Sequence, residues 1–373
     1  MENERLFDVG TRSDSRPGRH GETSFHVLNR RAGALWDRVR SHLESCYAAF
    51  PDEHKPGLVG RLRDDDERQH LPAWWELYVF TLFDRLKYKI EVHPELPGAT
   101  DKKDRPDFLV TKGPVSMYVE AAVVFNDDLK SDAWNWVCDC VNEAKNPDFK
   151  MVDLEIPTQG KRRPPKKEII GPLEEWLATW DAHQVVADYN AGSPLPRTQL
   201  RARDWVLDYT AAPVSPDRPG VPGRLIASYP IQAVDFRRDV KQLRKTLKHK
   251  GSKYGTLRKP LDKPLVMAIT SWNFLDESEV KETLFAPRGG YWRVGAEPRG
   301  TRISGLLFAE IMRVRSVASR LPELWINPRP LNAMPPLPPF GTVALDDGEL
   351  VRADASMTAG DLFDLSPEWP DRD

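Results

Sequence analysis

The stretch from Met117 to Val124 constrains the fold most, because it places a single acid in an otherwise apolar strand. Successive side chains of a β-strand point to opposite faces, so Glu120 shares a face with Tyr118 and Ala122. Apolar residues on both faces are typical of a central strand of a sheet. A buried carboxylate with no evident partner is a candidate functional group, although structural ion pairs produce the same pattern.

A hairpin brings a second acid opposite Glu120. A strand over Asp107 to Val110 precedes Gly113-Pro114, and a turn centred on those two residues places Asp107 directly across from Glu120. Opposed residues have Cβ atoms about 4.5 to 5.5 Å apart, and like charges there repel. The pair therefore invites a metal ion or a shared proton. This prediction depends on the register, since a shift by one residue moves the two acids to opposite faces.

A third acid, Glu76, lies in the middle of a helix predicted over Asp66 to Leu86. Apolar residues three, four and seven positions later share its face of the helix. A carboxylate in that position needs a cation or a basic side chain. The partner is either a bound metal or an arginine such as Arg61 or Arg63; alternatively, Glu76 lies exposed at the edge of the apolar face.

The composition indicates the class of protein. With 373 residues, 40% of them hydrophobic, the chain can bury one large core or two ordinary ones. Its three cysteines have neither metal-type spacing nor a paired count, which favours a reducing compartment. No apolar run of about 18 residues occurs. We expect a cytoplasmic protein that contacts no membrane.

The formal charge of -2 hides an uneven distribution. Residues 346–373 hold nine acids against two arginines, whereas residues 237–259 hold ten Lys and Arg against one acid. The basic stripe could attract phosphates or be a solvated helix face. The candidate nucleic-acid contacts on it are Arg237, Arg238, Lys241, Arg244, Lys245 and Lys248.

The pattern of apolar, basic and Pro-rich segments predicts seven regions. They are a disordered arm over 1–25, an N-terminal helical segment over 26–64, the first part of a core over 65–124 (a helix and three strands), an insertion over 125–234, the second part of the core over 235–275 (a basic helix and a strand), a C-terminal extension over 276–328, and a Pro-rich, acidic and partly disordered tail over 329–373.

A helix with Glu76, a strand, Arg105-Pro106-Asp107 opening a second strand and Tyr118-Val119-Glu120 in a third resembles the core of the PD-(D/E)XK nuclease superfamily. The basic helix and the apolar strand Leu265 to Ile269 complete its order. The resemblance implies an α/β (α+β), restriction-endonuclease-like core with a mixed central sheet flanked by helices. The large insertion would lie between the third core strand and the second core helix.

The whole chain is also similar to a group of uncharacterised, mainly actinobacterial proteins of similar length. The segments that carry this likeness are Trp75 to Tyr78, His93 to Gly98, Lys250 to Gly255 and Leu324 to Pro328. This likeness brings no activity with it.

The superfamily resemblance implies an endonuclease or exonuclease in which Asp107 and Glu120 hold Mg²⁺ or Mn²⁺, with Glu76 as a further or water-mediated ligand. DNA would be the substrate, with RNA as an alternative, and the oligomeric state, a dimer among the options, is left open. The sequence departs from the motif at Ala122, which stands where the superfamily has a lysine. Lys250 and Lys253 are the candidates to replace it.

Two other interpretations remain open at the level of sequence. A degenerate member of the superfamily would bind nucleic acid or a protein partner without cleavage, and Ala122 favours it. A glycosidase that uses Glu76 with Glu120 is a more remote alternative. The twelve tryptophans could stack on nucleic-acid bases or fill the core.

Overall fold

The computed structural model describes residues 5–96, 105–125, 132–214, 224–226, 236–255, 257, 260–272, 275–292 and 298–370, excluding the side chains of 132 and 236–239. The expected turn around Gly98 lies outside these residues. The chain divides into two compact units. Unit 1 consists of residues 1–14, 23–127 and 236–373, and unit 2 of residues 15–22 and 128–235.

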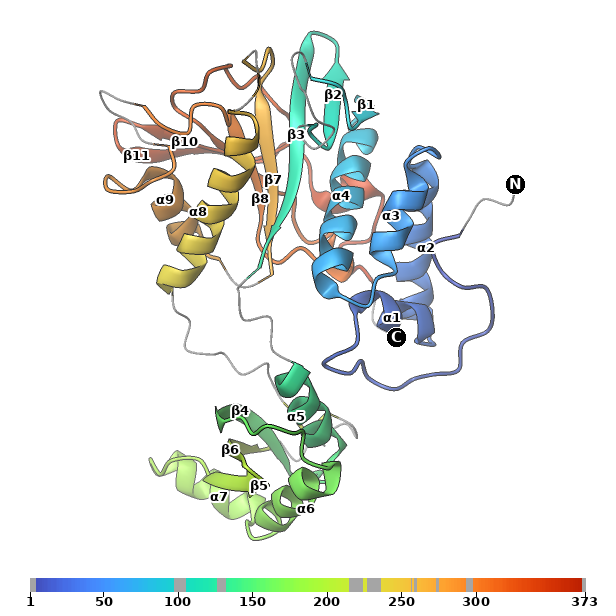
Figure 1. Ribbon diagram of the computed structural model, residues 1–373, viewed down its shortest axis with the longest axis vertical. Coiled ribbons are helices and arrows are strands. Elements are labelled where there is room, and N and C mark those ends of the chain that lie inside the picture. The colour runs from blue at the N-terminus through green and yellow to red at the C-terminus, as the bar shows by residue number, and fades with distance from the viewer. Residues whose placement is uncertain are drawn as a thin grey trace. The chain divides into compact units, whose positions relative to one another are not determined.

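Unit 1 is a mixed α/β structure built on one large sheet (Figure 1). Its described strands are β1 (Lys89–Val92), β2 (Phe108–Lys112), β3 (Val115–Val124), β7 (Leu265–Ser271), β8 (Gly305–Ala309), β9 (Glu323–Ile326), β10 (Thr342–Asp346) and β11 (Glu349–Ala353). They lie side by side in the order β1-β2-β3-β7-β8-β9-β10-β11. β3, β7 and β8 are parallel, while β1, β2 and β3 form an antiparallel meander, so the sheet is mixed, as predicted.

Helices cover both faces of this sheet, as Figure 1 shows. On one side lie α1 (Ser24–Arg30), α2 (Ala34–Ala49), α3 (Lys55–Leu62) and α4 (Glu67–Arg85), and on the other α8 (Phe236–Lys253) and α9 (Glu277–Phe285). The alternation of β3 decides which side chain meets which layer. Val119 packs in the core under α4, whereas Tyr118 and Ala122 pack in the core under α8. Glu120 therefore faces the α8 side.

The hairpin between β2 and β3 has the predicted register. Phe108 pairs with Val119 and Lys112 with Val115, which leaves Gly113 and Pro114 as a two-residue turn. Gly113 adopts a φ of 57°, a left-handed conformation that costs glycine little. The turn thus accommodates Pro114 within two residues.

Unit 2 has its own hydrophobic core. It contains α5 (Asp132–Glu143), α6 (Lys166–Leu177) and α7 (Ala182–Asn190) with the strands β4 (Phe149–Thr158), β5 (Arg197–Ala202) and β6 (Trp205–Pro213), paired in the order β4-β6-β5. The sequence predicted an insertion over 125–234, and Asp128–Asp235 forms the main part of this unit. Trp205 and Tyr209 are buried in its core rather than presented as stacking platforms.

Near both ends of the chain, described residues pack in unit 1. Leu6 and Phe7 of the expected arm (1–25) are buried, because the Glu44 carboxylate accepts both of their backbone N–H groups. The expected tail (329–373) supplies β10, β11 and α10 (Ala359–Phe363), and Phe363 is buried against Tyr78. In the tail, β10 pairs with β9 and with β11, and Phe363 of α10 contacts Tyr78 of α4, so this segment packs on surfaces far away in the sequence.

The predicted C-terminal extension (276–328) is part of the core rather than an addition to it. It provides α9, β8 and β9, and every residue of β8 is buried. No helix among the described residues is long and apolar enough to cross a membrane.

Candidate functional site

The site begins where β2 and β3 separate. The last pair of their ladder is Phe108 with Val119, beyond which β3 runs on beside β7 alone. Asp107 directly precedes β2, one residue beyond the last pair of the ladder. Its carboxylate accepts the backbone N–H of Ala121 at 2.7 Å. The side chain of Asp107 thus accepts a backbone N–H group of β3 beyond the end of the β2–β3 ladder.

Glu120 lies on β3 one residue beyond this last pair and is 1% exposed. Lys250 Nζ donates to its Oε1 at 2.6 Å, and Lys253 Nζ lies 3.1 Å from its Oε2. The hydroxyl of Tyr254 donates to the same Oε2. We call these four residues the Glu120 cluster.

The sequence of α8 explains why its lysines point inward. Leu243 and Leu247 are fully buried on the sheet, and Lys250 and Tyr254 follow on the same helical face. Lys253 also donates to the carbonyl of Arg105 at 2.7 Å. The basic helix is therefore anchored to both β3 and the chain that leads into Asp107.

Electrostatics keep the Glu120 cluster charged. Burial alone would raise the pKa of Glu120, but Lys250 and Lys253 outweigh burial and hold this pKa below its ordinary value. Burial alone would lower the pKa of Lys250, but Glu120 and Asp107 outweigh it and raise that pKa. The cluster is an ion pair reinforced by a second lysine.

Asp107 responds in the opposite direction. Burial, followed by the negative charges of Glu120 and Glu76, raises the pKa of Asp107 to about 8. The carboxyl group is therefore largely protonated at neutral pH unless a cation enters. Two neighbouring carboxyl groups that titrate in different ranges are typical of catalytic and metal-binding sites.

Glu76 meets an arginine, one of the two partners that the sequence suggested. Arg61 Nη1 lies 2.7 Å from its Oε2, and Glu76 is buried within α4. His93 lies close by: its backbone N–H donates to the carbonyl of Asp107 at 2.9 Å. Its ring packs edge-on against His54 at 5.5 Å between centroids.

These carboxylates fit a hard cation by chemistry but are not gathered around one point. Carboxylate oxygens are the ligands that Mg²⁺ and Mn²⁺ prefer. Nevertheless, the described part of the chain has no group of three or more His, Cys, Asp or Glu side chains arranged to hold a metal ion. Basic side chains neutralise Glu76 and Glu120 instead. A metal at Asp107 and Glu120 would have to displace a lysine.

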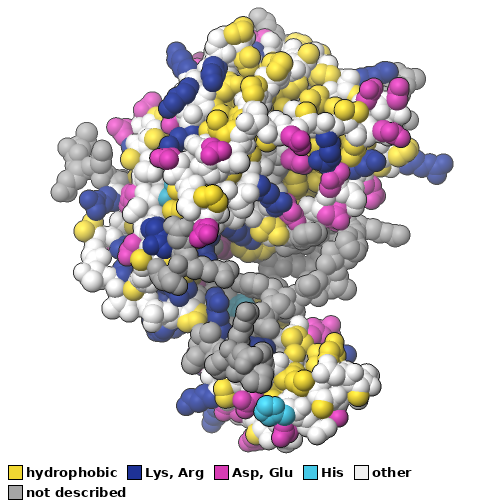
Figure 2. Space-filling view, turned by 180° about the vertical axis from the view of Figure 1, so that it is seen from behind, with side chains coloured by type: hydrophobic (Ala, Val, Ile, Leu, Met, Phe, Trp, Pro, Cys, Tyr) yellow, Lys and Arg dark blue, Asp and Glu magenta, His cyan; other side chains and the backbone are white. Residues whose placement is uncertain are grey.

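The basic stripe of α8 divides into two faces. Lys241, Lys245 and Lys248 are exposed, whereas Arg244 is partly buried near Gly289. The side chains of Arg237 and Arg238 lie outside the described residues. On the face seen in Figure 2, Lys and Arg alternate with Asp and Glu over the described surface of unit 1.

The position at which the superfamily motif has a lysine holds an apolar residue, Ala122. Ala122 is 7% exposed and packs with the residues under α8. The sequence suggested Lys250 and Lys253 as substitutes, and both reach Glu120 in the structure. The sequence did not predict that Tyr254 contacts Glu120 or that His93 lies beside Asp107. No sequence signal could have found these contacts, since they depend on how α8 and β1 dock on β3.

Unit 1 thus belongs to the class of mixed α/β proteins with a large central sheet flanked by helices. Comparison of the chain with protein-family models, with curated proteins and with solved structures finds no match. Any relation to the PD-(D/E)XK superfamily therefore depends on the residues and element order of this chain.

Proposed function

We propose that this chain is a metal-dependent nuclease with a restriction-endonuclease-like core. The observation that carries the proposal is the meeting of Asp107 with the Glu120 cluster at the point where β2 and β3 separate. The order α4, β1, β2, β3, α8, β7 supports it, because this is the order expected of that core. DNA is the proposed substrate, with RNA as the alternative polymer.

Asp107 and Glu120 would hold Mg²⁺ or Mn²⁺, with Glu76 as a further or water-mediated ligand. Such an ion, when bound, lowers the pKa of a coordinated water and neutralises charge on a phosphodiester. The raised pKa of Asp107 supports this assignment, because burial and then the negative charges of Glu120 and Glu76 cause it, and a bound cation would offset both effects.

Lys250 and Lys253 would do the work of the lysine that Ala122 replaces. Both are held at Glu120, and the pKa of Lys250 is above its ordinary value. A lysine that stays protonated cannot act as a base at neutral pH. Its role is to orient a water molecule and to balance the charge of the phosphate, while the exposed lysines of α8 contact the DNA backbone.

One observation favours the degenerate alternative, binding without cleavage. The Glu120 carboxylate already accepts hydrogen bonds from three side chains, which leaves little capacity for a metal. A protein that had lost catalysis could keep this ion pair as a structural element.

A cleavage assay distinguishes the two. Linear, circular and single-stranded DNA, and RNA, are incubated with the purified protein in Mg²⁺, Mn²⁺ or EDTA. Asp107→Asn, Glu120→Gln and Lys250→Met are compared with Glu277→Gln, whose ion pair with Arg352 at 2.5 Å is an exposed one in the same unit. We expect metal-dependent cleavage by the protein and by Glu277→Gln, and a loss of at least about 100-fold in the others.

Tight binding of nucleic acid with no cleavage in any metal would overturn the nuclease and support the degenerate alternative. Cleavage that persists in EDTA, or in Asp107→Asn, would overturn the assignment of the site.

A further inference from the structure

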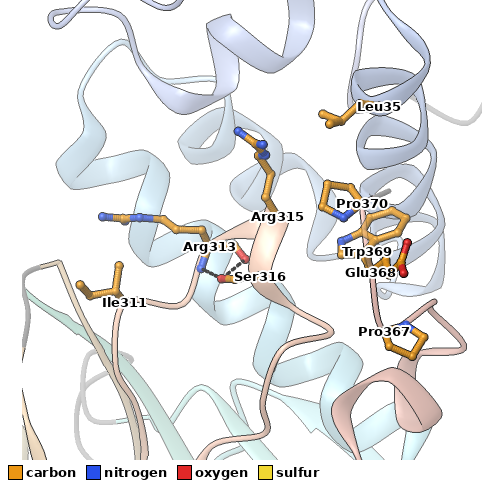
Figure 3. Close-up of a pocket in the computed structure, with 9 residues that line it drawn as sticks. All are labelled: Leu35, Ile311, Arg313, Arg315, Ser316, Pro367, Glu368, Trp369 and Pro370. Atoms are coloured by element: carbon orange, nitrogen blue, oxygen red, sulfur yellow. Dashed lines mark hydrogen bonds between the residues drawn. The ribbon is translucent and has the colours of Figure 1, made fainter. Parts of the chain in front are cut away.

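A second site candidate lies elsewhere on unit 1, in an open pocket of about 580 Å³. It is formed by Leu35 of α2, the segment after β8, the short 3-10 helix η2 (Val314–Ser316) and the C-terminal residues Pro367 to Pro370. It shares no residue with the Glu120 cluster. Figure 3 shows Arg315 of η2 with Trp369 and Pro370 on one side of it and Arg313 extending to the other side.

The place of the pocket in the sheet is one reason to consider it. β7 and β8 are parallel, and their carboxyl ends lead directly into Trp272 and Ile311. Open α/β sheets bind ligands in the crevice outside the carboxyl ends of parallel strands. Ile311 also has a φ of 40°, a strained conformation for a β-branched residue, and such strain concentrates at binding sites.

The arginines of this region are held in fixed positions by tryptophans. The Arg313 guanidinium lies 3.9 Å from the centroid of the Trp272 ring and also donates to the Trp272 carbonyl at 3.2 Å. Arg315 and Arg31 lie 5.2 and 4.4 Å from the ring of Trp36. A guanidinium stacked on an aromatic ring can present its N–H edge to an anion, and less conformational entropy is lost when it binds.

The opposite wall is aromatic. Trp369 Nε1 donates to the carbonyl of Val314 at 3.4 Å, and its ring contacts His42 at 5.4 Å between centroids. The ring therefore cannot turn easily. A fixed ring and fixed guanidinium groups that line the same pocket suit a ligand that has a planar part and a phosphate.

We infer that this pocket binds a nucleotide, with Arg313 and Arg315 receiving the phosphate and Trp369 contacting the base. The ligand is either a free nucleotide or one unit of a single-stranded nucleic acid. The inference goes beyond the proposed nuclease and does not depend on it, because the two sites have no residue in common.

Binding is measured on the full chain in EDTA, by calorimetry with AMP, ribose 5-phosphate and inorganic phosphate, and by fluorescence anisotropy with a short labelled thymidine oligonucleotide. Arg315→Glu alters an exposed side chain and should fold normally, which thermal melting checks. The double variant Arg313→Gln/Arg315→Gln removes both guanidinium groups. Arg320→Gln is the control, since Arg320 lies on the same segment but pairs with Glu310 at 2.9 Å outside the pocket.

We expect AMP or the oligonucleotide to bind the wild-type chain, binding to fall at least about tenfold in both pocket variants, and Arg320→Gln to remain within about twofold. Preference for the oligonucleotide over AMP would identify a strand-binding site, and the reverse a free-nucleotide site. Absence of binding, equal binding to the pocket variants, or ribose 5-phosphate binding as tightly as AMP would overturn the inference.

Asp107→Asn separates this inference from the proposed function. It should abolish cleavage and leave AMP binding unchanged. If the wild-type chain does not cleave but the pocket variants lose AMP binding, the proposed nuclease fails and the pocket stands.

Discussion

At the scale of the residue, Asp107 and Glu120 are two carboxyl groups near the end of the β2–β3 ladder whose pKa values shift in opposite directions. Glu120 has two lysines within hydrogen-bonding reach, whereas Asp107 accepts a backbone N–H and has two acids for neighbours. The cations lower one pKa, and burial with like charge raises the other. Their titration therefore provides separate tests of the site.

The raised pKa of Asp107 predicts how stability varies with pH. The folded state keeps a proton up to about pH 8 that the unfolded chain releases near its ordinary value of 3.8, so this stabilisation is complete below that value and is lost as the pH rises towards 8. The free energy of unfolding should fall by at most about 1.4 kcal/mol for each pH unit in this window. Urea denaturation of the wild-type chain and of Asp107→Asn over this pH range measures the free energy of unfolding. The decrease with pH that Asp107 causes should be absent from the variant.

Metal binding should depend on pH in the opposite sense, because only the ionised Asp107 binds a cation. Mg²⁺ affinity, measured by calorimetry, should rise as the pH approaches 8. An affinity that is constant from about pH 6 to pH 8, the window set by that raised pKa, would contradict a role for Asp107 as a ligand.

Glu120→Gln should destabilise unit 1. It leaves Lys250 and Lys253, whose side chains are 29% and 21% exposed, facing each other without the carboxylate between them. Removing one partner of a buried pair costs about 3 kcal/mol, whereas the exposed pair that Glu277→Gln removes is worth under about 1 kcal/mol. Urea denaturation of both variants gives the comparison. Equal stabilities would mean that Glu120 is not essential to the packing of α8.

At the scale of the element, α8 serves two purposes with two faces. Its inward lysines complete the Glu120 cluster, and its outward lysines form a cationic row. The apolar side chains of Leu243 and Leu247 set the rotation of the helix. The division of charge therefore follows from hydrophobic packing.

The outward row predicts a change in salt dependence. The double variant Lys241→Gln/Lys245→Gln should weaken DNA binding and lower the slope of log affinity against log salt by about 1 for each phosphate that the helix no longer neutralises. Lys89→Gln/Lys281→Gln, which changes two exposed lysines off the stripe, is the matched control. Fluorescence anisotropy over a salt series measures both. An unchanged slope in the α8 variant would exclude this face as the DNA contact.

At the scale of the whole molecule, the chain divides its sequence between two hydrophobic cores. Unit 1 is closed by segments from both ends of the chain, since Leu6 and Phe363 are buried in the same core. Unit 2 has its own core, around residues such as Leu173 and Trp205. The two units should therefore respond differently to deletion.

Replacing residues 128–235 with a short Gly-Ser linker should leave unit 1 able to unfold cooperatively, because this removes one complete core. Truncation after Asn327 should abolish cooperative unfolding. It removes β10, β11 and α10 and strips Phe340 and Phe363 from the main core. Thermal melting, monitored by circular dichroism, compares the deletion variant with the truncation variant. A truncated chain that melts like the wild type would contradict this division.

Local sequence patterns predicted the elements around the site. Periodicity predicted the α4 helix and the β2–β3 register, because a face of apolar residues and a Gly-Pro turn are local properties. It also suggested Lys250 and Lys253 as candidates to replace the motif lysine, since they lie on a basic helix before the next strand, and both contact Glu120 in the structure.

Which charged side chains contact each other depends on long-range packing. The pairing of Glu76 with Arg61, the hydrogen bond from Tyr254 to Glu120 and the ordering of both chain ends depend on surfaces far apart in the sequence. A carboxylate looks the same in a sequence whether a lysine, an arginine or a metal neutralises it. The apolar face of α8 packs on the sheet and brings Lys250 and Lys253 to Glu120, whereas at Asp107 burial and two acidic neighbours outweigh the effect of Lys250.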